Sequence, residues 1–328
     1  MTSFRPSKQM IIWILVGLCV LAIPVGLISS YVQAGKNADA EFDSSPFRPV
    51  IDHLLVLELK GMIISGDDSA FAKVGSAGWL NRQLRRAEKD SHVKGVLLRL
   101  NSPGGTVATS QEIQQSVLSF RKTGKPIVVS MVDVAASGGY YVACAADKIV
   151  ALPGTITGSI GVIMNLYNLQ GTEQKLGIQA EVIKSGKFKD IGSFSRPMTG
   201  EERELLQGII LDNYDQFIHA VSDGRHMDLE AVKKIADGRI ISGRQAKDAG
   251  LVDELGGYQE AVAGLQELSK KKFGHTEDLK VIDKRIPTIL SVLMESASTG
   301  AYPSSLFDQL LPESMRFSYH KQPLWLMQ

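Results

Sequence analysis

The chain has 328 residues, of which 44% are hydrophobic and 22% are charged, and its formal net charge is +1 at pH 7. This length is enough for one large or two modest domains, and the near-neutral balance gives no support for nucleic acid as a partner. Outside an apolar N-terminal segment, Cys144 is the only cysteine, so the rest of the chain cannot form an internal disulfide and must rely on a hydrophobic core. No CxxC, HExxH or acidic metal-binding loop is present, and we expect neither a metal ion nor a cofactor.

The N-terminal segment Met10–Val32 carries no charged residue. About 20 apolar residues suffice to cross a bilayer as a helix. Arg5 and Lys8 precede it, so the positive-inside rule places residues 1–9 in the cytoplasm and the rest of the chain on the other side of the membrane. A cleaved signal peptide is the alternative, because small residues precede Gly35. The length of the apolar run favours a retained transmembrane anchor at 10–32.

Strands and helices alternate after a polar linker at 33–50. This alternation predicts βαβ units with parallel strands, hence an α/β domain over residues 51–285. The predicted strands are His53–Lys60, Val93–Leu100, Pro126–Val134 and Ile149–Leu152, and the predicted helices between them are Trp79–Asp90, Thr106–Lys122 and Ser137–Ala146.

The second half of the domain is predicted to be mainly helical. A strand is expected at Ala180–Lys184, and a capping box at Thr199–Glu202 opens a long helix that runs to about Ser222. The apolar face of that helix is predicted to consist of Leu205, Leu206, Ile209, Ile210 and Phe217. Further helices are predicted at Leu229–Ala236, Gly243–Ala249 and Gln259–Lys271.

The C-terminal tail, residues 286–328, is moderately apolar and ends in PLWLMQ. It can pack on the domain, lie in a groove or touch the membrane, and no physical argument from the sequence selects one of these. One hypothesis is that the tail enters the binding groove of its own or a neighbouring subunit, because an apolar chain end resembles a hydrophobic peptide substrate.

The candidate catalytic residues lie at two breaks, which are points where an apolar strand ends and a helix begins. Ser137 stands at the second break, followed by two glycines, and a serine at a helix N-terminus meets backbone N–H groups that favour developing negative charge. The first break, Asn101–Gly105 (NSPGG), lets a second backbone N–H approach the same point. The pattern predicts a nucleophile with an oxyanion hole, although each stretch alone is more often an ordinary turn.

A serine nucleophile needs a base, and none of the six histidines has a motif context. An unperturbed lysine titrates near ~10.4, so a lysine base must lose roughly three pKa units, about 4 kcal/mol, to be neutral near pH 7. Lys189, which follows Phe188, is a candidate, and Lys184 and Lys187 are rivals by sequence alone.

Five ordered stretches resemble the signal peptide peptidase A (SppA, protease IV) family in its short, single-domain bacterial form. They are Asn101–Gly105, Ala136–Tyr141, Ala145–Met164, Lys184–Asp190 and Ala236–Gly257. The resemblance implies a Clp-protease/crotonase-like fold and a Ser–Lys dyad. It places Ser137 as nucleophile, Lys189 as general base and Ser159 as the residue that orients the lysine, with Gly104 and Gly138 as oxyanion-hole donors.

The same resemblance implies a serine endopeptidase that acts on hydrophobic peptides, including cleaved signal peptides. Together with the predicted anchor at 10–32, it implies a catalytic domain held on the outer side of a bacterial inner membrane. It also implies a ring- or dome-shaped homo-oligomer. Two alternatives share the fold: a crotonase-type acyl-CoA enzyme, which export argues against, and a non-catalytic membrane scaffold, which the presence of both Ser137 and Lys189 argues against.

Overall fold

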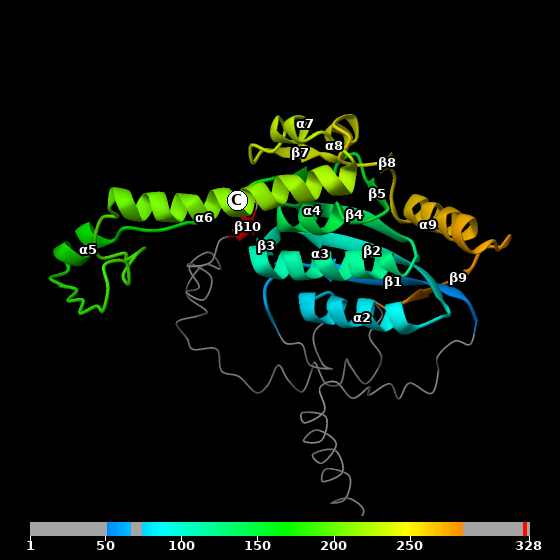
Figure 1. Cartoon of the computed structure of the whole chain (residues 1–328), viewed down its shortest axis with the longest axis horizontal. Helices are drawn as coiled ribbons and strands as arrows, with labels where there is room; N and C mark the ends of the chain where they lie inside the picture. Colours follow the sequence, from blue (N-terminus) through cyan, green and yellow to red (C-terminus); the bar gives the residue numbers. More distant parts are fainter. Residues whose placement is uncertain (1–50, 67–73, 285–323, 327–328) are drawn as a thin grey trace, which may run out of the picture. The chain divides into compact units, whose positions relative to one another are not determined.

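The structure is a computed structural model that describes residues 51–66, 74–284 and 324–326 (Figure 1). The predicted anchor at 10–32, the linker at 33–50 and most of the tail at 286–328 lie outside the described residues. Within the described ranges, no helix combines the length and the apolar character needed to cross a bilayer.

A mixed, mainly parallel β-sheet forms the centre of the molecule, and its path runs in the order β7-β6-β4-β2-β1-β9. The first half of β4 also pairs with β5, which pairs with β8, and β6–β7 is the antiparallel pair of this sheet. The strands are β1 (His53–Lys60), β2 (Val93–Ser102), β4 (Ile127–Ala136), β5 (Lys148–Ala151), β6 (Ile156–Gly158), β7 (Ile240–Ser242), β8 (Glu254–Leu255) and β9 (Lys280–Asp283). A second, two-stranded sheet pairs β3 (Gly104–Thr106) with β10 (Leu324–Leu326) in antiparallel orientation.

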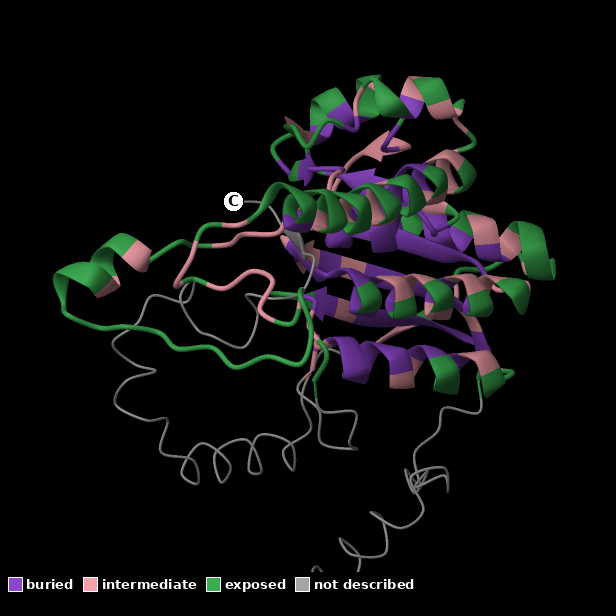
Figure 2. Cartoon of the chain, turned by 60° about the vertical axis from the view of Figure 1, so that its left-hand side comes forward, coloured by how far each residue is buried: buried purple, intermediate pink, exposed green. Residues whose placement is uncertain are grey.

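Both faces of the central sheet are covered by helices, as expected of parallel strands. Alternate residues of β1 enter two separate cores: Leu55 and Leu57 face the core shared with α2 (Ala77–Lys89) and α3 (Val107–Lys122), whereas Leu54 and Val56 face the core shared with α9 (Tyr258–Phe273). Figure 2 shows the strands buried along most of their length and the outward sides of the helices exposed.

The remaining helices lie beyond β4. They are α4 (Gly138–Ala143), α5 (Gln170–Lys175), α6 (Gly200–Arg225), α7 (Leu229–Lys233) and α8 (Gly243–Asp248). The predicted capping box is confirmed: Thr199 accepts a hydrogen bond from the Glu202 N–H, and the Glu202 side chain accepts one from the Thr199 N–H. The predicted helix that begins at Ser137 is shorter than expected, because α4 ends at Ala143.

The predicted strand Ala180–Lys184 is absent, and these residues are irregular and exposed. Ile183 is 97% exposed. A β-strand needs a neighbouring strand to satisfy its backbone groups, and this stretch pairs with no described strand. It belongs to an arm, residues 165–199, that both views show lying beyond the N-terminal end of α6 and away from the central sheet (Figures 1 and 2).

The buried apolar residues of helix α6 all lie in its C-terminal half. Phe217 packs edge-to-face on Tyr141 of α4, with ring centroids 5.2 Å apart. Leu205 and Ile209, which were predicted to lie on the buried face, are each 46% exposed. The prediction of one continuous buried face is therefore wrong for the first half, because that half extends past the sheet (Figure 1). The partners that Glu201 and Glu202 have there, Lys187 and Arg196, are polar.

Candidate active site

Ser137 lies at the junction of β4 and α4. Its side chain is fully buried, and its Oγ has no hydrogen-bond partner among the described residues. The Ser137 N–H donates to Gly158 O at 2.9 Å, and the Ser137 carbonyl accepts the first hydrogen bond of α4 from the Tyr141 N–H at 2.9 Å. Buried hydroxyls are almost always paired, so an unpaired one at a strand-to-helix turn marks a candidate for chemistry.

The backbone at Ser137 is strained, with φ 52° and ψ −122°. Among the described non-glycine residues, only Ser137, Ser159 and His226 have positive φ. Such a conformation costs on the order of 1–3 kcal/mol and persists where surrounding structure enforces it, often at a functional site. Two of the three instances are serines that the sequence analysis singled out.

The sheet register brings Ser159 next to Ser137. Ala136 of β4 pairs with Gly158 of β6, and each serine directly follows its member of this pair. Adjacent strands lie about 4.8 Å apart, so the two serines are neighbours at the carboxyl ends of parallel strands. Ser159 lines a cavity of about 560 Å³, and most of the other lining residues are apolar, among them Val162 and Ile163.

The two glycine-rich turns meet at the start of α4. A Cβ added at Gly138 would lie 2.4 Å from Ser110 Oγ and 3.2 Å from Gly105 N, so only glycine fits there. Gly104 has φ +103° and donates its N–H to Ser102 Oγ at 3.1 Å. The two candidate oxyanion-hole glycines, Gly104 and Gly138, therefore lie in adjoining turns. The hydrogen bond from the Gly104 N–H to Ser102 Oγ must break before this N–H can bind an oxyanion.

The strand β3 has an edge that accepts an extended peptide. Strand β10 occupies this edge, with Trp325 opposite Gly105 and Leu326 opposite Gly104. Antiparallel strand addition is a common way for a protein to hold an extended peptide segment. Residues 324–326 of the tail thus pair with β3 of the same chain, and the entry of the tail into a substrate-binding groove stays a prediction.

Lys189 is not brought to Ser137 within this chain. It lies exposed in the arm, in a succession of turns, and its side chain makes no ion pair with another described residue. The two rival lysines are both paired: Lys184 Nζ lies 2.6 Å from Asp190 Oδ1, and Lys187 pairs with Glu201. The structure therefore singles out Lys189 as the lysine of this stretch whose amine is not committed to a carboxylate.

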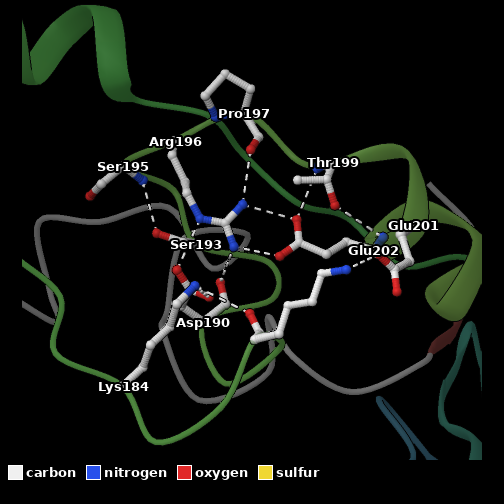
Figure 3. Close-up of polar contacts among 10 residues, drawn as sticks. Lys184, Asp190, Ser193, Ser195, Arg196, Pro197, Thr199, Glu201 and Glu202 are labelled. Carbon is white, nitrogen blue, oxygen red and sulfur yellow. Dashed lines mark hydrogen bonds and ion pairs between the residues drawn. The ribbon is translucent and has the colours of Figure 1, made fainter.

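Three residues near the candidate groups were missed by the sequence analysis. Ser102 stands inside the NSPGG stretch and accepts from Gly104, and Ser110 lies against Gly138 and donates to Thr106 O at 2.9 Å. Arg196 binds Asp190 and Glu202, as Figure 3 shows. The position of Ser102 in the motif was a usable signal, whereas no local pattern pointed to Ser110 or Arg196.

The Arg196 cluster also fixes the charge state of its carboxylates. Hydrogen bonds from Arg196 and then from Lys184 hold the pKa of Asp190 well below its usual range. Hydrogen bonds from Arg196 and from the Thr199 N–H lower the pKa of Glu202 to about 2. Both carboxylates are therefore ionised at neutral pH, and Arg196 stays charged between them.

Comparison with known proteins places the chain among peptidases. Residues 119–272 match the profile of Peptidase family S49. The chain is 38% identical over 276 residues to a Synechocystis protein named "Putative protease", a match that covers 82% of this chain and 94% of the relative. It is 43% identical over 188 residues to the "Putative signal peptide peptidase SppA" of Enterococcus faecium and 48% identical over 182 residues to a "Putative protease" of Methanocaldococcus jannaschii. These two matches cover 57% and 56% of this chain, and the chain spans 55% and 58% of the length of those relatives.

Proposed function

The chain belongs to the signal peptide peptidase A (SppA, protease 4) family, peptidase family S49, and on this basis we propose that it is a membrane-anchored serine endopeptidase with Ser137 as nucleophile and Lys189 as general base. The proposed substrates are hydrophobic peptides, including signal peptides already cleaved from exported proteins. The proposed fold is of the Clp-protease/crotonase type. The anchor at 10–32 would hold the domain on the outer side of a bacterial inner membrane, next to such peptides.

The observation that carries this proposal is the buried, unpaired Ser137 hydroxyl on a strained turn. Gly138 follows it at the start of α4, where an added Cβ would lie only 3.2 Å from Gly105 N, so the two glycine-rich turns lie close together. A substrate strand on the edge of β3, where β10 now lies, would run past this point. A serine, backbone donors and a strand-binding edge are the parts that acyl transfer from an extended peptide requires.

The second half of the dyad would come from another copy of the chain. Lys189 is exposed on an arm that lies away from the sheet carrying Ser137 (Figure 1). The same arm and the first half of α6 expose large apolar residues such as Ile183, Leu205 and Ile209. Burial of these residues in a ring- or dome-shaped homo-oligomer would place Lys189 of one copy at Ser137 and Ser159 of the next. Desolvation there would favour the neutral amine that a base requires.

The reaction then follows from the positions of these groups. Neutral Lys189 would take the proton of Ser137 as the hydroxyl oxygen attacks the peptide carbonyl, while Ser159 would hold the amine. The backbone N–H groups of Gly138 and Gly104 would stabilise the oxyanion. Protonated Lys189 would next give its proton to the leaving amine, and a water activated by the same lysine would hydrolyse the acyl-enzyme.

The test is turnover of a fluorogenic hydrophobic peptide by the full chain in detergent. Wild type is compared with Ser137→Ala and Lys189→Ala, and Lys187→Ala serves as the matched control because it removes a nearby lysine that is already ion-paired. We expect activity in wild type and the control and none in the other two variants. Activity that survives Lys189→Ala near pH 7 would refute the dyad. Inactivity of all four proteins would favour a non-catalytic scaffold.

A mixing experiment tests where the lysine comes from. Ser137→Ala and Lys189→Ala chains are assembled together in equal amounts. If each site joins two copies in a closed ring, about one quarter of the sites pair an intact serine with an intact lysine, so about a quarter of wild-type activity returns. If both groups come from one chain, no activity returns.

A further inference from the structure

Arg196 is the centre of a charged cluster in the arm, and this cluster surrounds the residue next to Lys189 (Figure 3). Its Nε donates to Asp190 Oδ2 at 2.9 Å, and its two terminal nitrogens donate to the two carboxylate oxygens of Glu202, one of them at 2.9 Å. Lys184 Nζ donates to the other Asp190 oxygen, Oδ1, at 2.6 Å. Both oxygens of Asp190 are therefore engaged by cations.

The cluster joins the arm to the first turn of α6 through Glu202. The Glu202 side chain is 3% exposed and closes the capping box at the start of α6. Arg196 also donates to Pro197 O at 3.0 Å, so the guanidinium fork has fixed partners on three sides. An arginine held in this way keeps its carboxylate partners in one geometry, which the single ammonium of a lysine does not do.

The backbone around Lys189 has little else to hold it. Residues 186–193 form consecutive turns, with hydrogen bonds from Lys189 N to Gly186 O, from Ile191 N to Phe188 O and from Ser193 N to Asp190 O. No helix or strand includes this stretch. The position of Lys189 relative to α6 therefore depends on the side-chain contacts of its neighbours, which are the pair of Asp190 with Arg196 and the exposed pair of Lys187 with Glu201.

We propose that Arg196 is a positioning residue for Lys189: it ties the turn that carries Lys189 to the start of α6 and keeps the Asp190 carboxylate away from the Lys189 ammonium. This inference rests on the proposed function, in which Lys189 is the general base. Asp190 directly follows Lys189, so an oxygen released by Arg196 can turn toward that amine. A nearby carboxylate stabilises a protonated lysine, which cannot accept the serine proton.

Two other charged side chains of the arm have partners of their own. Lys187 pairs with Glu201 at the start of α6, and Glu173 of α5 accepts a hydrogen bond from Ser195 Oγ at 2.8 Å. Among the described residues, Lys184 and Arg196 are thus the cations that neutralise Asp190. Loss of Arg196 leaves Lys184 on one oxygen and frees the other.

The experiment compares Arg196→Gln and Arg196→Lys with Arg121→Gln, all in the full chain in detergent. Arg121 is a matched control, because its side chain is 31% exposed against 29% for Arg196. Arg121 also binds one carboxylate, Asp147, and one carbonyl, Ala145 O, but it lies at the end of α3 outside the arm. Peptide turnover is measured from pH 5 to 10 per mole of folded, assembled protein.

We expect Arg196→Gln to lower kcat about tenfold near pH 7 with KM within about twofold, and to move the acid limb of the kcat profile up by about one pH unit. Arg196→Lys should not rescue, because an ammonium cannot bridge both carboxylates. Asp190→Asn added to Arg196→Gln should return the acid limb toward wild type, because the freed carboxylate is gone. Arg121→Gln should leave the profile unchanged.

A merely structural role for Arg196 would give another result: fewer assembled molecules, but an unchanged kcat and pH profile for those that remain. That result, or full rescue by Arg196→Lys, would overturn the proposal. Ser137→Ala and Lys189→Ala are measured in parallel. If either retains activity, the proposed dyad is wrong, and this outcome is distinct from a normal profile of Arg196→Gln in an enzyme whose dyad is confirmed.

Discussion

Replacement of Gly138 with alanine is expected to destabilise the protein by about 1–3 kcal/mol, the usual cost of adding a methyl group to a filled site. The added Cβ would lie 2.4 Å from Ser110 Oγ, far inside van der Waals contact. Ser110 cannot move away easily, because it is fully buried and its hydroxyl donates to Thr106 O at 2.9 Å. The obstruction is thus a single oxygen atom, and a second substitution can remove it.

Ser110→Ala alone should cost about 0.5–1.5 kcal/mol through its lost hydrogen bond. In the Gly138→Ala background the same change should cost little or restore stability, which gives a coupling free energy of about 1–2 kcal/mol. Restoration should be incomplete, because the new Cβ still lies 3.3 Å from Ser110 Cβ and 3.2 Å from Gly105 N.

The measurement is urea unfolding of the four proteins, followed by circular dichroism. Gly208→Ala is the control: Gly208 lies inside α6, its added Cβ would meet no atom within 4 Å, and alanine there should stabilise the helix by up to about 1 kcal/mol. If the effects of Gly138→Ala and Ser110→Ala simply add, the close approach of α3 to the start of α4 is not what selects glycine at position 138.

Three further outcomes are expected. Tyr140→Phe should cost about 1–3 kcal/mol in urea unfolding, because the buried hydroxyl donates to Leu251 O at 2.8 Å and its loss leaves that carbonyl unpaired; an unchanged midpoint would refute this. The pKa of Glu202 falls from 4.5 to about 2 on folding, so its stabilisation is present above about pH 4.5 and is lost as the pH falls toward 2. Thermal unfolding of Glu202→Gln should accordingly vary less with pH than wild type across this window, and equal slopes would contradict the pairing. Deletion of residues 324–328 should raise the initial rate of peptide cleavage, because β10 occupies the edge of β3; an unchanged rate would exclude the tail as a competitor.

The strands β1, β2, β4 and β5 and the helices that cover them were predictable from the sequence. The range of β1 matches its prediction, and α2 and α9 lie within two residues of theirs at each end, because continuous apolar runs and helical spacing are local signals of buried elements. The capping box at Thr199 is equally local, and it was confirmed. Ser137 could be found in the same way, since an apolar strand that breaks into small residues marks the turn where a side chain is presented.

The predictions that failed concern segments that need a second structural element to pair with or to cover them. The local sequence does not show whether that element is present. The stretch Ala180–Lys184 has the apolar residues of a strand but no neighbour among the described strands, and the apolar face of α6 is covered only near Phe217, which packs on Tyr141 of α4. The spacing of apolar residues shows that one face of a helix or strand is apolar. It does not show whether another part of the same chain covers that face.

The sequence by itself determined that the segments of β1, β2, β4 and β5 form strands and which serine stands at the end of β4, because both depend on residues close together in the chain. Only the tertiary structure decided that Ser159 lies beside Ser137, since this follows from the pairing of Ala136 with Gly158 across the sheet. It also decided that Lys189 stays exposed on the arm and that Arg196 holds the residue after it. Contacts of this kind join residues through side-chain geometry and strand order, and no local pattern encodes them.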